Sequence, residues 1–150
     1  MNNAKKELKL MSILILAFAA LTIVMNCIKA FTGGLTITEL PADAKNLGLT
    51  LEAYQIVSYI TFALTLLFIL PNVFVGLRGL KMSKEPAKTK GHIVWAFILG
   101  ALALVSMFSH IPQAIGTPNF DNIWTVIDKA VEAFIFGTYI YYAILVYREA

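Results

Sequence analysis

The chain has 150 residues, of which 59% are hydrophobic and only 14% are charged. With a mean hydropathy of +0.75, it has too few polar groups to cover a soluble globule, so the composition excludes the soluble class and makes the lipid bilayer its solvent. The formal charge is +3, and lysine and arginine are distributed unevenly between the connecting segments. This distribution is typical of residues that set the orientation of a protein in the membrane, and it does not indicate nucleic-acid binding.

Four apolar runs predict four membrane spans, at residues 10–30, 54–80, 93–111 and 130–147. About 20 helical residues cross the ~30 Å hydrocarbon layer at ~1.5 Å per residue. The first run follows three lysines, as a secretion signal does, but its roughly 19 apolar residues exceed the usual signal core and no small-residue cleavage site follows. We therefore expect an uncleaved first span. Pro71 in the second span removes a backbone donor and predicts a kink there.

The connections alternate in character along the chain. Residues 31–50 contain Gly33, Gly34 and Pro41, which predicts an irregular segment with room for one short helical turn. Residues 81–91 form a short, lysine-rich connection. Residues 112–121 contain Gly116 and Pro118, and Asp121 at their end is the expected N-cap of the last helix.

Positive charge falls on alternate connections. Nine of the 12 basic residues precede the first span, lie in or just before the connection at 81–91, or follow the fourth span. The other two connections and their adjoining turns carry six of the 9 acids. Cytoplasmic loops are enriched in lysine and arginine. The sequence therefore predicts an all-α, antiparallel four-helix transmembrane bundle, a single domain with both termini in the cytoplasm. Short loops and the lysine-rich inner face favour the cytoplasmic membrane of a bacterium.

A faint internal repeat aligns residues 52–60 with residues 132–140. A true repeat would make the protein two parallel helical hairpins, as in some transporters. Biased composition also produces such matches by chance, so both interpretations stay open.

Small residues recur at helical spacing in the second and third spans. Because such residues let helix backbones approach closely where no hydrophobic force drives association, we interpret them as packing positions. They are Gly76, Gly79, Ala96 and Gly100.

Ionisable and amide side chains gather in the outer third of the predicted bundle. Asp128 and Glu132 are four residues apart and share a helical face. A carboxylate in hydrocarbon costs about 2.5–3.5 kcal/mol, so Glu132 should be paired, protonated or hydrated, with Lys29 and His110 as candidate partners. The full candidate set is Asn26, Lys29, His110, Asp128 and Glu132.

Three interpretations of this set stay open: ion pairs that fix the helix ends, a cation or proton site built from Asp128, Glu132 and His110, or a site for a small polar ligand or a partner's basic loop. One histidine with two acids is not a metal signature, so no metal or cofactor is predicted. His92 is expected to be an interfacial residue without a special role.

No catalytic motif is present, so we expect no enzymatic activity. The sequence favours a membrane protein that acts through helix contacts, as an accessory subunit bound to another membrane protein or as a homo-oligomer. The alternative is a small transporter or channel with an outward-facing polar site made of the candidate set.

Overall fold

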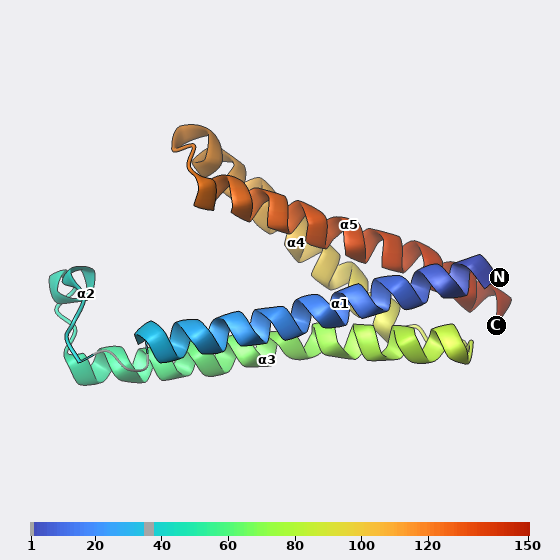
Figure 1. Ribbon diagram of the computed structural model, residues 1–150, viewed down its shortest axis with the longest axis horizontal. Helices are drawn as coiled ribbons and strands as arrows, with labels where there is room; N and C mark the ends of the chain where they lie inside the picture. Colours follow the sequence, from blue (N-terminus) through green and yellow to red (C-terminus); the bar gives the residue numbers. More distant parts are fainter. Residues whose placement is uncertain (1, 35–37) are drawn as a thin grey trace. The chain divides into compact units, whose positions relative to one another are not determined.

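The computed structural model of the protein describes residues 2–34 and 38–150. All regular elements in this part of the chain are helices: α1 (Asn2–Lys29), which continues into one π-helical turn (Ala30–Gly34), α2 (Ala42–Asn46), α3 (Leu51–Lys84), α4 (Gly91–Gly116) and α5 (Phe120–Glu149) (Figure 1). Four of them are long and apolar enough to cross a membrane. This confirms the predicted all-α protein with four such helices.

The long helices extend beyond the predicted spans. The connection expected at 112–121 shrinks to residues 117–119, because α4 continues through Pro112 to Gly116. Asn119, and not Asp121 as predicted, caps α5: its side-chain oxygen accepts a hydrogen bond from the Asn122 backbone N–H at 2.8 Å. Asn and Asp cap helices about equally well, and capping at Asn119 makes α5 two residues longer than capping at Asp121 would.

The chain divides into two compact units: unit 1 comprises Met1–Ala17 and Pro71–Ala150, and unit 2 comprises Phe18–Leu70. Helix α3 runs unbroken through Pro71, and its division between the units falls at this proline. A proline ring removes one helical hydrogen bond and so lowers the cost of bending there. The kink expected at this residue stays a prediction.

Unit 1 has a continuous buried core to which all four long helices contribute, and within it α4 and α5 lie side by side (Figure 1). Alternating large and small side chains let the helices approach closely. The buried residues of this core include Leu8 and Met11 of α1, Val75 and Met82 of α3, Ile93 and Ala96 of α4, and Phe136, Tyr139 and Val146 of α5.

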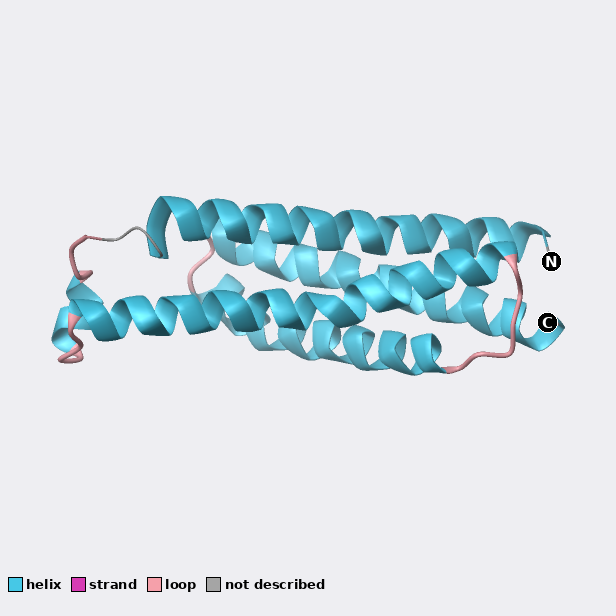
Figure 2. Cartoon of the chain, turned by 90° about the horizontal axis from the view of Figure 1, so that it is seen from below, coloured by secondary structure: helices cyan, strands magenta, loops and turns pink. Residues whose placement is uncertain are grey.

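The basic segments of the sequence gather at one end of unit 1. Both chain termini lie at this end, and so does the connection between α3 and α4 (Figure 2). The ammonium group of Lys90 lies 5.5 Å above the ring of Tyr147, which joins that connection to the last turns of α5. A cation over an aromatic face is attractive even at exposed sites.

Unit 2 contains the second half of α1, the π-helical turn, α2 and the first half of α3. The short helix α2 confirms the helical turn expected within residues 31–50. Gly48 follows it with φ +73, a left-handed conformation that glycine adopts without a steric penalty. Its N–H donates to the carbonyl of Lys45 at 3.0 Å, which closes the turn before α3.

Candidate functional site

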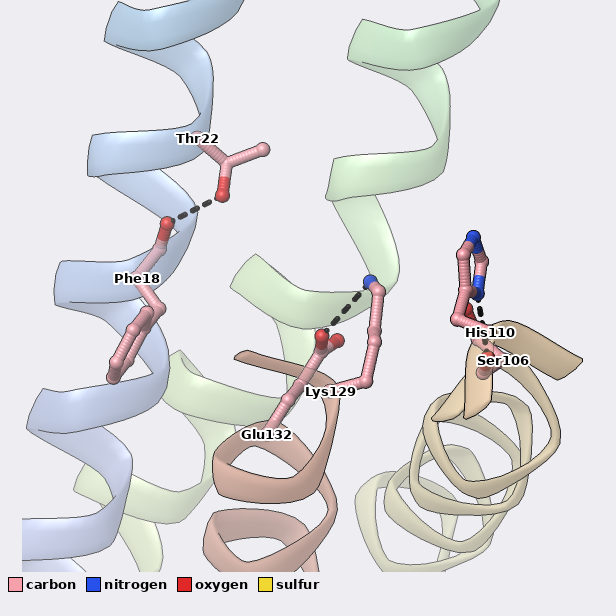
Figure 3. Close-up of polar contacts among 6 residues, drawn as sticks. All are labelled: Phe18, Thr22, Ser106, His110, Lys129 and Glu132. Atoms are coloured by element: carbon pink, nitrogen blue, oxygen red, sulfur yellow. Dashed lines mark hydrogen bonds and ion pairs between the residues drawn. The ribbon is translucent and has the colours of Figure 1, made fainter. Parts of the chain in front are cut away.

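The candidate residues of unit 1 are held by their own helices. His110 Nδ1 lies 2.6 Å from the carbonyl oxygen of Ser106, one turn earlier in α4 (Figure 3). Glu132 forms an ion pair with Lys129 at 3.1 Å, three residues earlier in α5, and not with either partner proposed from the sequence. Both members of this pair are about one-third exposed, so it contributes at most about 1 kcal/mol.

The cation site considered for His110, Asp128 and Glu132 receives no geometric support. No hydrogen bond or ion pair joins His110 to either acid in the described residues. Across residues 2–34 and 38–150, no three His, Cys, Asp or Glu side chains converge as metal ligands would. Asp128 is half-buried on α5.

Asn26 and Lys29, the two candidate residues of unit 2, lie on the last turn of α1 and line one pocket. The pocket has a volume of about 400 Å³ and lies between the second half of α1 and the first half of α3. Its wall from α3 is rich in hydroxyl groups. The lining residues are Asn26, Lys29, Ala30, Tyr54, Val57, Ser58, Thr61, Phe62 and Thr65.

Three polar side chains of this pocket form hydrogen bonds to backbone carbonyls of their own helices. The Asn26 amide donates to the carbonyl of Thr22 at 2.9 Å, and the Ser58 hydroxyl donates to the carbonyl of Tyr54 at 2.9 Å. The Thr65 hydroxyl donates in the same way to the carbonyl of Thr61 at 2.8 Å. Such bonds to residue i−4 let serine and threonine lie within apolar helices with their protons satisfied.

Lys29 carries a positive charge at the rim of the pocket. No acidic side chain lies within ion-pair distance of it in the described part of the chain, and it is exposed. It is the last residue of α1 before the π-helical turn, which begins at the lining residue Ala30. Single π-helical turns are rare and are frequent at functional sites.

A second polar cluster, which the sequence did not reveal, lies inside unit 1. His92, for which no special role was expected, is 1% exposed and so lies among the helices of unit 1 rather than at its surface. Its Nδ1 lies 2.6 Å from the hydroxyl oxygen of Tyr139, which in turn donates to the carbonyl of Val75 at 3.0 Å. The rings of His92 and Tyr139 meet edge to face at 5.9 Å.

The hydrogen bonds of this cluster fix the histidine tautomer. A tyrosine hydroxyl has one proton, and here it goes to Val75, so the hydroxyl oxygen accepts from His92 and Nδ1 carries the ring proton. His92 Nε2 is buried without a hydrogen-bond partner among the described residues. The signal that could have revealed His92 is its position one residue into α4, beside the small residues that mark the packed face.

The small residues at the predicted packing positions contact helices of the same chain. Gly79 lies against Ser12 of α1 and Tyr139 of α5, and Gly76 lies against Leu16 of α1. Gly100 approaches Phe136 of α5, and Ala96 is completely buried in the core of unit 1. These four positions are therefore occupied by contacts within unit 1.

Comparison of the chain with protein-family models, with curated proteins and with solved structures finds no match. Its function therefore has to follow from its own residues.

Proposed function

We propose that this protein is an antiparallel four-span protein of the cell membrane that binds a small polar solute, as a small transporter or channel does. The pocket in unit 2 carries the proposal. Its volume lies within the range typical of small-molecule sites, and it combines apolar walls with a few polar groups. Contact with lipid alone does not account for a lysine, an amide and several hydroxyls at one pocket.

The other function expected from the sequence was contact with a partner protein or a second copy. The small residues that motivated it contact α1 and α5 of this same chain, so they supply no argument for a partner. The pocket therefore favours solute binding, and no catalytic step belongs to the proposal.

The proposed orientation places both termini and the connection at 85–90 in the cytoplasm. Gathering of the basic segments at one end of unit 1 supports it, because such segments stay on the cytoplasmic side. Asn26, Lys29 and α2 would then lie near the outer surface.

Cysteine labelling tests this orientation. In a Cys27→Ser background, we expect Lys45→Cys to react with a membrane-impermeant maleimide added to intact cells. Lys84→Cys should react only after the cells are made permeable, because it ends α3 among the basic residues. Labelling of Lys84→Cys on intact cells would overturn the orientation.

The same background tests whether the pocket is open to water. Thr61 lines the pocket, whereas its neighbour Ile60 lies on a different face of α3 and is 55% exposed there. Both side chains are exposed in the protein alone, so only the pocket distinguishes them. We expect Thr61→Cys to react with a membrane-impermeant thiosulfonate added from outside at least about tenfold faster than Ile60→Cys, since thiolate forms only where water reaches.

Ile60→Cys is the matched control because lipid should cover it. Equal rates at the two positions, or no reaction at Thr61→Cys, would contradict a water-filled pocket and with it the proposed function. A solute that binds in the pocket, added before the reagent, should slow the reaction of Thr61→Cys and leave that of Ile60→Cys unchanged.

A further inference from the structure

We propose that the pocket binds a small organic anion that also carries hydrogen-bond donors, with the anionic group on Lys29 and the donors on oxygen atoms of Asn26, Ser58 and Thr65. This inference rests on the proposed function, because it names the class of solute for the same pocket.

The charge of the pocket favours an anion. Among the lining residues that the structure describes, Lys29 is the one basic side chain and none is acidic. The exposed ammonium group of Lys29 has no opposite charge within ion-pair distance in the described residues. A carboxylate or phosphate group of the ligand would supply that charge through charge-assisted hydrogen bonds.

Two hydroxyl groups of the pocket, those of Ser58 and Thr65, favour donors on the ligand, whereas the hydroxyls of Tyr54 and Thr61 can donate to its anionic group. A serine or threonine hydroxyl has one proton and two lone pairs, and the protons of Ser58 and Thr65 go to helix carbonyls. What these two side chains present to a ligand is therefore acceptor oxygen, to which the side-chain carbonyl of Asn26 adds another. Hydroxyl or amine groups on the ligand would satisfy them.

The size and the apolar walls of the pocket require an organic skeleton. This pocket is an open groove with a volume of about 400 Å³, which is larger than a bare inorganic anion needs and has room for a molecule with several carbon atoms. Val57 and Phe62 line it beside the polar groups. They would contact the carbon atoms between the anionic group and the donors.

Two sources share this chemistry: a free solute, such as a hydroxylated carboxylate or phosphate, and the headgroup of an anionic lipid such as phosphatidylglycerol. Both carry the anion and the donors, and the experiment below separates them.

The test measures thermal unfolding of the purified full-length protein in dodecyl maltoside micelles, with four soluble probes. Glycerol 3-phosphate and glycerate combine an anion with hydroxyl donors, sulfate has only the anion, and glycerol has only the donors. A ligand that binds the folded state raises the unfolding temperature with its concentration. We expect one or both organic anions to stabilise the protein, sulfate to do so at least about tenfold more weakly, and glycerol to have no effect.

Variants assign the effect to the pocket. Lys29→Gln should weaken binding of the organic anions by about tenfold or more, the usual effect of losing a charged hydrogen bond, and Lys29→Arg should retain it. Lys45→Gln is the matched control, because it removes the same charge from exposed α2 in the same unit. Ser58→Ala should weaken the organic anions and leave sulfate unchanged.

The lipid source is tested in nanodiscs without soluble anion. Stabilisation by phosphatidylglycerol over phosphatidylcholine that disappears in Lys29→Gln would identify a lipid headgroup as the ligand. If neither the soluble anions nor phosphatidylglycerol gives stabilisation that depends on Lys29, the anion assignment is wrong. A reactive Thr61→Cys together with that result would leave the solute pocket standing, whereas an unreactive Thr61→Cys would remove the pocket itself.

Discussion

Replacement of Gly79 by alanine is expected to lower the free energy of unfolding by about 1–3 kcal/mol or more, the usual penalty for overpacking. A Cβ atom at this position would lie 2.5 Å from Cε2 of Tyr139 and 2.7 Å from its hydroxyl oxygen, and it would overlap Ser12 Oγ. Tyr139 and Ser12 are both completely buried, so neither can move aside without displacing α1 or α5. Unfolding in mixed micelles titrated with SDS and followed by circular dichroism measures the change.

Gly137→Ala is the matched control for this experiment. Gly137 lies in the interior of α5, two residues before Tyr139, and nothing lies within 4 Å of the Cβ that alanine would add. Alanine is favoured over glycine inside a helix by roughly 1 kcal/mol, so this variant should be as stable as the parent protein or more so. A Gly79→Ala variant that unfolds like Gly137→Ala would show that α1, α3 and α5 do not meet at Gly79.

Replacement of Tyr139 by phenylalanine is the second change with a large expected effect, a loss of about 1–3 kcal/mol of stability. It removes one hydroxyl that accepts from His92 Nδ1 and donates to the Val75 carbonyl. The ring still fills its space, so the loss reports hydrogen bonding rather than packing. His92 is 1% exposed, and a buried donor without an acceptor carries its full desolvation cost.

Tyr141→Phe controls for removal of a tyrosine hydroxyl from the same helix. Tyr141 is 60% exposed, so its variant should change stability by less than about 0.5 kcal/mol. A double-mutant cycle of Tyr139→Phe with His92→Leu should show coupling of about 0.5–3 kcal/mol, because the two side chains share one bond. Additive effects would mean that His92 and Tyr139 do not depend on each other in the folded protein.

Helices were the most predictable part of this protein. Runs of apolar residues long enough to cross a membrane have to be helical, because only a helix satisfies every backbone group within one segment. All four predicted runs lie in helices, and α2 lies in the segment expected to hold a helical turn. The ends were less predictable: α4 passes Pro112, because a proline removes only one helical hydrogen bond and need not end the helix.

The candidate site was predictable only in part. Polarity within an apolar run identified Asn26 and Lys29, which the structure brings together at one pocket. The same criterion identified His110 and Glu132, which bond instead to Ser106 and Lys129 of their own helices. A partner three or four residues away competes with any distant one at little entropic cost. Sequence spacing therefore predicted which residues were unusual without predicting what they contact.

Composition and periodicity by themselves determined that this chain is all-helical and has four helices suited to a bilayer, because the cost of exposing backbone and charge to hydrocarbon is a local property of each segment. Tertiary structure alone decided that His92 is buried against Tyr139 and that hydroxyls of α3 share a pocket with Lys29 of α1. Those contacts depend on how side chains of separate helices fit together, and residues far apart in sequence carry no local signal of that fit.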